Sequence, residues 1–221
     1  MVKEMSNRNQ KHGLLKKTFV LMFSLILYST LFIPPATTEL NNRQKIQSSI
    51  SAHSNPKTIR VPENYTKIQW AINNASEGDT ITVDPGLYNE NVVVNKTVSI
   101  IGENKDTTIL DAKGTLFYVT ADYVVISGFT LRNGYAGVWL WYSKNTTIRG
   151  NNINNNSYGI KADHSSNSTI SENNISNSQW FSIVLDQSGN STLKNNHMVG
   201  TRYNLRVDGD FLPDFINNID T

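Results

Sequence analysis

Gly137-Val138-Trp139-Leu140-Trp141 opens a unit of sequence that continues through Asn145-Thr146-Thr147-Ile148 to Asn151-Asn152-Ile153. The unit recurs from residue 115 to the end of the chain. Its apolar anchors are Ile126, Ile148, Ile170 and Leu193, and the apolar partners five residues later are Leu131, Ile153, Ile175 and Met198. The period is nearly constant at about 22 residues, a length that is typical of a solenoid.

Within each unit, apolar residues alternate with outward-facing neighbours, as Val138 and Leu140 do around Trp139. A period of two residues indicates a strand, and the intervening Asn, Ser, Thr and Gly favour tight corners. One unit cannot bury its apolar face alone, so the units must stack in parallel. The sequence therefore predicts an all-β fold, a parallel β-helix of about six rungs. The general preference of parallel crossovers predicts that the helix is right-handed.

The composition excludes several classes of protein. The chain has 221 residues and no Cys, so disulfide bonds and thiolate metal sites are excluded. Residues 1–55 hold 7 of the 20 Lys and Arg but only 2 of the 18 Asp and Glu. Residues 56–221 therefore carry 13 basic and 16 acidic residues, a net charge of −3, and no nucleic acid is predicted as a partner.

The N-terminus is typical of an export signal. Lys11, Lys16 and Lys17 precede an apolar run over residues 19–33, and Pro34-Pro35-Ala36 follows it. Because the run is shorter than the ~20 residues of a spanning helix, we interpret residues 1–36 as a cleaved signal peptide, with an uncleaved signal anchor as the alternative. Residues 37–55 are a polar linker, and residues 56–221 form the β-helix domain. We expect an extracellular or cell-surface protein that contacts the membrane only through its N-terminal segment.

The segment before the repeats is predicted to cap the β-helix. Its apolar residues follow the i, i+3, i+4, i+7 spacing of a short helix, at Ile68, Ala71, Ile72 and Ala75. Thr66 is placed to cap the start of this helix. Residues 80–83 and 92–94 are predicted strands. A helix laid across the open end of the β-helix would cover unpaired strand backbone.

The same region carries a family resemblance. The motifs are Ile59-Arg60-Val61-Pro62, Ile68-Gln69-Trp70-Ala71-Ile72, Gly78-Asp79-Thr80-Ile81-Thr82-Val83, Pro85-Gly86-Leu87-Tyr88-Asn89-Glu90 and Ile101-Gly102-Glu103-Asn104. Over residues 57–221 the chain resembles right-handed parallel β-helix proteins of the pectin-lyase-like superfamily, and within it the family named for the periplasmic copper-binding protein NosD, with its archaeal surface relatives. The resemblance implies the fold. It implies no single activity, because the superfamily includes lyases, hydrolases, esterases and proteins without known activity.

Ligand chemistry on a β-helix belongs to its outward columns, in which neighbours are about 4.8 Å apart. One predicted column holds Val119, Trp141, Asp163, Asp186 and Asp208. The column beside it holds Phe117, Trp139, Lys161, Val184 and Arg206. The residues predicted to form a ligand-binding face are Trp139, Trp141, Lys161, Asp163, His164, Asp186, Arg206 and Asp208. In this face Lys161 and Arg206 are candidate counterions for the stacked carboxylates.

Three interpretations of this face remain open. In the favoured one, the protein recognises a cell-surface glycan or an envelope protein, or acts as a scaffold, without catalysis, and the Trp rings stack on sugars. In the alternative, it is a polysaccharide lyase or glycoside hydrolase acting on an acidic or envelope glycan, and the Asp column supplies an acid and a base or binds Ca²⁺. In the third, the face is structural. No pectin-methylesterase or polygalacturonase motif can be placed on the chain, so no catalytic residue is assigned.

The family name raises the possibility of copper. The repeats contain His164 and His197, and His197 with Met198 resembles a pair of soft ligands. However, Met198 occupies the same position as Ile153 and is predicted to point inward, and the two histidines lie at different corners. We therefore assign no metal ligands, and Ca²⁺ stays the only candidate cofactor.

Asparagines are predicted mainly to hold the corners. One column holds Asn151, Asn173 and Asn196, whose amides can pair along the helix, and a second holds Asn152, Asn174 and His197. Eight Asn-x-Ser/Thr sequons are candidates for glycosylation in an exported chain, at Asn64, Asn74, Asn95, Asn145, Asn155, Asn167, Asn174 and Asn190. Asn145, Asn167 and Asn190 share one position in the repeat and are predicted to turn a corner.

At the C-terminus the repeats stop at Thr221 without a capping helix or a polar last rung. We expect the domain to be C-terminally incomplete. An open strand edge also templates association, so end-to-end self-association is predicted.

Overall fold

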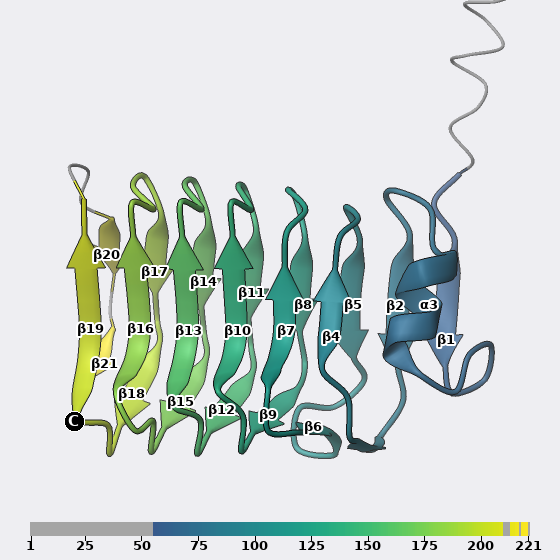
Figure 1. Ribbon diagram of the computed structural model, residues 1–221, viewed down its shortest axis with the longest axis horizontal. Helices are drawn as coiled ribbons and strands as arrows, with labels where there is room; N and C mark the ends of the chain where they lie inside the picture. The colour runs from purple at the N-terminus through teal and green to yellow at the C-terminus, as the bar shows by residue number, and fades with distance from the viewer. Residues whose placement is uncertain (1–54, 210–212, 217, 221) are drawn as a thin grey trace, which may run out of the picture. The chain divides into compact units, whose positions relative to one another are not determined.

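The computed structural model describes residues 55–209, 213–216 and 218–220, which form a right-handed parallel β-helix (Figure 1). Each turn passes through three parallel sheets, which we name A, B and C in the order in which the chain meets them. The predicted leader and all of the linker except Asn55 lie outside the described residues. The fold class predicted from the sequence repeat is confirmed.

The strands are short, and each pairs with the strand one turn away. Sheet A has eight strands, β1 (Thr58–Val61), β2 (Thr80–Val83), β5 (Ser99–Gly102), β8 (Val125–Ser127), β11 (Thr147–Arg149), β14 (Thr169–Ser171), β17 (Thr192–Lys194) and β20 (Asp214–Ile216). Sheet B has seven, β3 (Gly86–Tyr88), β6 (Thr108–Asp111), β9 (Thr130–Arg132), β12 (Asn152–Asn154), β15 (Asn174–Ser176), β18 (His197–Val199) and β21 (Ile219–Asp220). Sheet C has six, β4 (Val92–Val94), β7 (Thr115–Val119), β10 (Ala136–Trp141), β13 (Tyr158–Asp163), β16 (Phe181–Asp186) and β19 (Tyr203–Asp208).

The solenoid has about seven turns, whereas the sequence predicted about six. The strands predicted over residues 80–83 and 92–94 are confirmed as β2 and β4. The difference arises because the segment that we treated as a cap also contributes β3, β5 and β6 to the sheets. These strands lack the Asn-rich corners of the later repeats, so the period did not reveal them.

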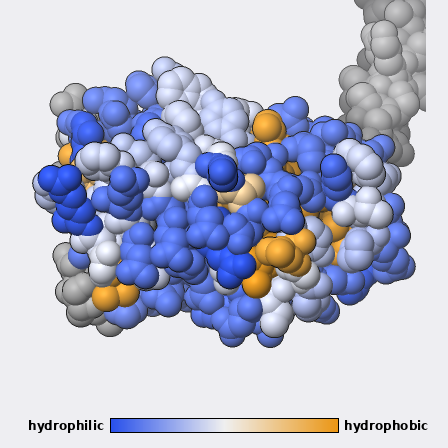
Figure 2. All heavy atoms as spheres, turned by 60° about the horizontal axis from the view of Figure 1, so that its bottom comes forward, coloured by the Kyte–Doolittle hydropathy of each residue, from blue (hydrophilic) through white to orange (hydrophobic). Residues whose placement is uncertain are grey.

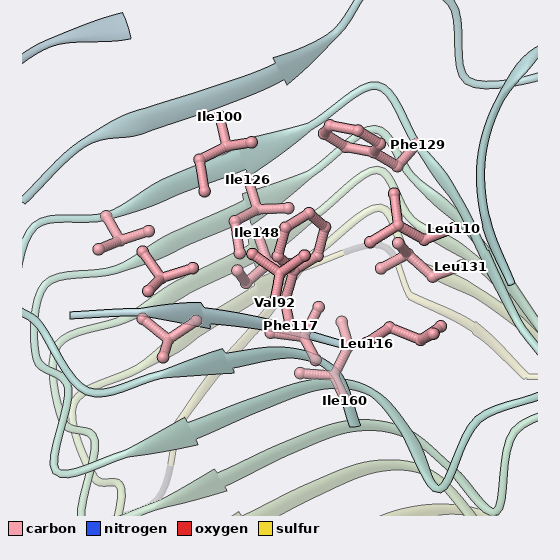
Figure 3. Packing of buried hydrophobic residues seen from close by; sticks show 14 of the residues in the cluster. Val92, Ile100, Leu110, Leu116, Phe117, Ile126, Phe129, Leu131, Ile148 and Ile160 are labelled. Carbon is pink, nitrogen blue, oxygen red and sulfur yellow. The ribbon is translucent and has the colours of Figure 1, made fainter. Parts of the chain in front are cut away.

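The core is a set of apolar columns that run along the helix axis (Figure 3). Ile126, Ile148, Ile170 and Leu193 pair in register in sheet A, and Leu131, Ile153, Ile175 and Met198 do so in sheet B. All eight side chains are buried. The inward positions predicted from the repeat, including that of Met198, are therefore confirmed.

A column of buried asparagines lines the corner between sheets A and B. Asn173 shows the pattern: its Oδ1 accepts a hydrogen bond from the backbone N–H of Asn151 (3.1 Å), and its Nδ2 donates to Ile148 O (2.9 Å) and to Asn196 Oδ1 (3.0 Å). Asn151 and Asn196 repeat this pattern. The predicted structural column is confirmed, and it satisfies backbone groups that the corner would otherwise leave unpaired.

A hydroxyl ladder at the corner between sheets C and A was not predicted. The backbone N–H of Ser143 donates to Ser165 Oγ (3.1 Å), and that of Ser165 donates to Ser188 Oγ (2.9 Å). Three residues later, Thr146, Ser168 and Ser191 form a second buried ladder. Buried hydroxyls thus take the role at this corner that the amides take at the other.

Helix α3 (Ile68–Asn74) lies at the N-terminal end and packs Ile68, Ala71 and Ile72 into the core (Figure 1). The predicted capping helix is confirmed, but the prediction that Thr66 caps it is wrong. The residue before the helix is Lys67, which makes no side-chain cap, and the carboxylate of Glu90 instead accepts the N–H groups of Ile68 (3.1 Å) and Gln69 (3.2 Å). This cap comes from a distant part of the chain, so local sequence could not reveal it.

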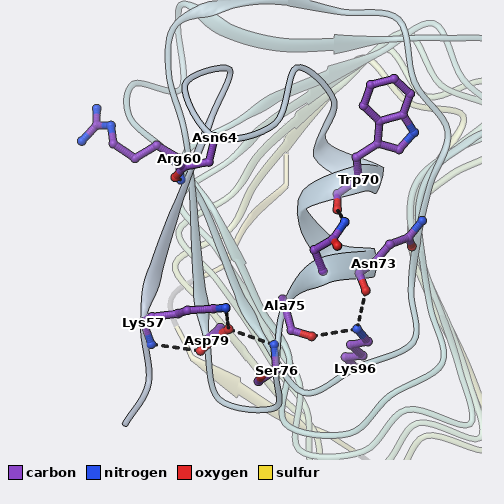
Figure 4. Close-up of polar contacts among 10 residues, drawn as sticks. Lys57, Arg60, Asn64, Trp70, Asn73, Ala75, Ser76, Asp79 and Lys96 are labelled. Carbon is purple, nitrogen blue, oxygen red and sulfur yellow. Dashed lines mark hydrogen bonds and ion pairs between the residues drawn. The ribbon is translucent and has the colours of Figure 1, made fainter. Parts of the chain in front are cut away.

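Buried Asp79 joins β1 to the end of the helix (Figure 4). Its carboxylate accepts the backbone N–H groups of Lys57 (2.9 Å) and Ser76 (2.8 Å). Burial alone would raise the pKa of Asp79, but these hydrogen bonds and the charges of Lys57 and Lys96 hold it below its ordinary value. Lys96 Nζ also donates to Asn73 O (2.8 Å) and Ala75 O (2.7 Å), the carbonyl groups at the end of α3.

Candidate ligand-binding face

The outer surface of sheet C brings the predicted site residues together. One outward column holds Tyr118, Trp139, Lys161, Val184 and Arg206, and the next holds Trp141, Asp163, Asp186 and Asp208. The prediction that Phe117 and Val119 begin these columns is wrong, because both side chains are fully buried. The repeat spacing places Phe117 opposite Trp139, but Tyr118 is the residue that pairs with it, so the spacing misplaces β7 by one residue and by one face.

Aromatic rings cover much of this surface. We call this set the aromatic platform, and its members are Tyr118, Tyr135, Trp139, Trp141, Tyr142, Tyr158, Phe181 and Tyr203. Neighbouring ring centroids lie between 5.1 Å, for Trp141 and Tyr142, and 6.3 Å, for Tyr158 and Phe181. The side chains of Trp141 and Tyr142 are 39% and 54% exposed. The platform is therefore a connected aromatic surface in contact with solvent.

The centre of the platform is a compact polar unit. Trp139 Nε1 donates to Asp163 Oδ2 (2.5 Å), and Lys161 Nζ donates to the same oxygen (2.6 Å). Lys161 Nζ also stands 4.4 Å from the centroid of the Trp139 ring. As a result Asp163 is only 4% exposed, although it belongs to an outward column. Its charge is matched by Lys161 before any ligand arrives.

The remaining carboxylates of the column differ from one another. Arg206 Nη2 donates to Asp208 Oδ2 (2.7 Å), and the hydrogen bond and negative charge of Asp208 raise the pKa of Arg206. Lys161 and Arg206 thus occupy the counterion positions that the sequence indicated. Asp186 lies between the two pairs, half-buried, and in the described part of the chain its carboxylate makes no hydrogen bond or ion pair. The described residues contain no group of three or more His, Cys, Asp or Glu arranged to hold a metal ion.

The histidines and Met198 do not converge. The ring of His164 stacks on Tyr142 at the edge of the platform, with centroids 4.6 Å apart. His197 is exposed on sheet B, in register with Asn174, and Met198 is buried in the core. Sheet B lies at the bottom of Figure 1, and Figure 2, in which this side is turned forward, shows a mostly hydrophilic surface. Among the described residues, His164, His197 and Met198 therefore do not fit a copper site.

The eight sequon asparagines are all in the described part of the chain. Asn145 is half-buried and the other seven are exposed. Asn174 lies on sheet B and Asn74 ends α3, whereas the others lie in loops. Asn145, Asn167 and Asn190 have positive φ angles of 54°, 58° and 55°, which confirms the predicted left-handed corner.

Most of the platform was missed from the sequence. Tyr118 was hidden by the register error in β7. Tyr158, Phe181 and Tyr203 begin successive sheet C strands and pair in register. Their spacing follows the period of the repeat, and an alignment of every aromatic residue against that period would have revealed them.

Comparisons with known proteins agree with this architecture. The model of the family described as periplasmic copper-binding protein (NosD) matches residues 72–210. A "Cell surface glycoprotein" of Methanothermus fervidus is 32% identical over 112 residues, which cover 48% of this chain and 18% of that protein. The match thus spans less than a fifth of that relative.

Two solved structures share the fold. An alginate lyase from Paenibacillus sp. str. FPU-7 superposes with a TM-score of 0.57 and 18% identity, over 73% of this chain and 75% of the lyase. The ORF18 protein of Geobacillus virus E2 gives a TM-score of 0.58 and 14% identity, over 84% and 44% of the two chains. At such identities the likeness concerns the fold alone. The family match covers more than half of the residues, and the chain therefore belongs to the NosD family.

Proposed function

We propose that this chain is an exported surface protein whose sheet C face binds carbohydrate without cleaving it. The observation that carries the proposal is the aromatic platform. Rings of Trp and Tyr combine a flat apolar body with a polar tip, which suits a sugar ring whose faces are apolar and whose rim is hydroxylated. Exposed aromatic area of this kind usually marks a binding surface.

The surface location is supported by two observations. The N-terminal sequence is typical of a signal, and a matching relative is described as a cell surface glycoprotein. Within residues 55–209, 213–216 and 218–220, no helix has the length and hydropathy needed to cross a bilayer. We propose that the N-terminal segment either is removed on export or holds the protein at the membrane.

The pairing of the carboxylates supports a noncatalytic role. Glycoside hydrolysis uses two carboxyl groups, one as an acid and one as a base or nucleophile. Here one oxygen of Asp163 already accepts hydrogen bonds from Lys161 and Trp139, and Asp208 is paired with Arg206. Asp186 is left as a single carboxylate without a comparable partner in the described part of the chain.

The proposal is tested by binding of the full chain to a panel of soluble neutral and acidic glycans, measured by titration calorimetry. We expect Trp141→Ala and Tyr142→Ala each to weaken binding about tenfold without changing the melting temperature. Trp70→Ala is the matched control, because Trp70 is 50% exposed but lies on α3. If all three variants bind glycans with the same affinity as the parent, the face is structural and does not bind carbohydrate.

A second measurement on the same glycans distinguishes binding without cleavage from the enzymatic alternative. Incubation with the parent chain is followed for new reducing ends, which report hydrolysis, and for unsaturated ends, which report elimination. We expect neither product. Turnover that is abolished by Asp186→Asn would assign the face to a glycoside hydrolase or a lyase instead.

A further inference from the structure

Three complete acceptor sequences occupy one corner of the solenoid in consecutive turns. They are Asn145-Thr146-Thr147, Asn167-Ser168-Thr169 and Asn190-Ser191-Thr192. Each lies where the chain leaves a sheet C strand and enters the next sheet A strand, at the top of Figure 1. The three asparagines therefore form a row along the edge of the molecule.

The backbones of Asn145 and Asn167 are held by hydrogen bonds, whereas the side chains of all three asparagines are not. The N–H groups of Asn145 and Asn167 each donate to a carbonyl of the next turn, Ser166 O and Gly189 O, both at 3.1 Å. In the described residues, none of the three side-chain amides makes a hydrogen bond, and those of Asn167 and Asn190 are exposed. By contrast, Nδ2 of Asn74, another sequon residue, donates to Trp70 O (2.8 Å).

The corner itself does not require a sequon. One turn earlier, Tyr123 adopts the same left-handed conformation, with φ of 57°, and its N–H donates to Lys144 O (3.0 Å). Val125 pairs in register with Thr147, and Thr147 pairs in turn with Thr169. The position of the third sequon residue therefore accepts an apolar residue. The left-handed corner favours asparagine but does not require it, and the fold does not require the hydroxyl that recurs two residues later in the next three turns.

We propose that Asn145, Asn167 and Asn190 are N-glycosylation sites that form a row of glycans along the corner between sheets C and A. The donor is a glycosyl phosphate ester on a lipid carrier, supplied by the export pathway. A bond forms between Nδ2 and the anomeric carbon, and the bond from that carbon to the phosphate oxygen breaks. Nδ2 loses one proton, the phosphate leaves with the electron pair, and no oxidation occurs.

Crowding limits how many of these sites are filled at once. Neighbouring turns of a parallel sheet are about 4.8 Å apart, and an N-linked glycan is bulky. Asn145 and Asn190 are separated by two turns, whereas Asn167 has a neighbour on each side. A molecule therefore carries glycans on Asn145 and Asn190 together or on Asn167, and at most two of the three sites are filled.

The test uses the full chain, expressed in a host that exports and N-glycosylates proteins, with glycopeptide mapping and intact mass spectrometry. The test variant replaces Thr147, Thr169 and Thr192 by Val, the residue found at position 125, which removes the acceptors and keeps the asparagines. Its control replaces the same three residues by Ser, which keeps the acceptors. We expect one or two glycans on the row in the parent and the Ser variant and none in the Val variant, with equal melting temperatures after enzymatic removal of glycans.

Two results would overturn the inference. If the row carries no glycan in the parent while an exported control glycoprotein from the same culture is modified, the three asparagines are corner residues only. If intact mass and mapping find all three filled in one molecule, the crowding limit is wrong. Thr169→Val alone sharpens the second point, because it should raise occupancy of Asn145 and Asn190.

Discussion

The first turn of the solenoid and the later repeats solve the same problem with different chemistry. In the repeats, corner side chains pair with the equivalent side chain one turn away, as in the Asn151–Asn173–Asn196 column. No turn precedes the first one in the part of the chain that the structure describes, and single side chains there take the place of a neighbouring backbone. Gln69 is the clearest case, because its amide accepts from Val93 N–H (2.7 Å) and donates to Val93 O (3.1 Å), as a neighbouring strand would.

The exposed edge of β1 is treated in the same manner. Asn64 Oδ1 accepts the backbone N–H of Arg60 (2.7 Å), and the backbone N–H of Asn64 donates to Arg60 O (2.8 Å). Both groups of Arg60 that face away from the sheet are thereby paired, which protects an edge that would template association. The comparison teaches that the same residue in each turn can satisfy the corners along the repeats. The end of the solenoid instead needs individual residues, such as Gln69 and Asn64, that have no equivalent in other turns.

The largest effect is expected from a charge inside the repeats. Ile170 is fully buried between Ile148 and Leu193 in sheet A. Ile170→Asp should unfold the domain, because a buried unpaired carboxylate costs several kcal/mol and the whole fold is stable by only about 5–15 kcal/mol. Circular dichroism and thermal melting check this. Thr169→Asp is the control on the outer surface, and equal melting of the two variants would contradict the assignment of inward positions.

The next effect tests the asparagine column. Asn173→Leu keeps the size of the side chain but leaves the N–H of Asn151 and Ile148 O without their partners. We expect a loss of about 2–6 kcal/mol, since each of the two buried unsatisfied groups costs about 1–3 kcal/mol. Asn174→Leu, one residue later and exposed, is the matched control in chemical denaturation. Equal stability of the two variants would show that the amide column does not stabilise the fold.

A third prediction concerns the first turn and acid. The pKa of Asp79 is lowered in the folded state, so its stabilising contribution is complete above the unfolded-state pKa of about 3.9 and is lost as the pH falls through the folded-state value. Asp79→Asn should cost about 1–3 kcal/mol at neutral pH. It should also flatten the loss of stability below about pH 4. If the free energies of unfolding of the parent and the variant differ by the same amount at every pH, groups other than Asp79 cause the loss of stability in acid.

These differences explain what could be predicted from the sequence. The fold, the core columns and the asparagine column follow from residues that recur at a constant spacing, and the structure confirms them. The cap by Glu90, the strand mimicry by Gln69 and the contact of Asp79 with Lys57 involve single residues and partners that are distant in the sequence, and no period reports them. The outer face lies between these cases, because the spacing placed Trp139 and Lys161 correctly but misplaced β7 by one residue.

The smallest effect is expected where a repeat departs from its own rule. Asn156 reaches back one turn, where its Oδ1 accepts from Gly134 N–H (2.8 Å) and its Nδ2 donates to Leu131 O (3.0 Å). The equivalent residue one turn later is Ser178, whose buried hydroxyl has no hydrogen-bond partner in the described structure.

Ser178→Asn should restore the pattern, because the longer amide would reach the N–H of Asn156 and Ile153 O, the groups equivalent to those that Asn156 binds. The Asn156 amide lies against Gly137, where an added Cβ would be 3.4 Å away, and a glycine, Gly159, occupies the equivalent position one turn later. We expect a gain of about 1 kcal/mol, the net value of a buried hydrogen bond, measured by chemical denaturation. Ser178→Ala is the control and should change stability little, because the lost hydroxyl is unpaired. A variant with Asn that is less stable than the one with Ala would show that the corner at this turn has closed around the smaller side chain, and that the repeats tolerate local exceptions as the first turn does.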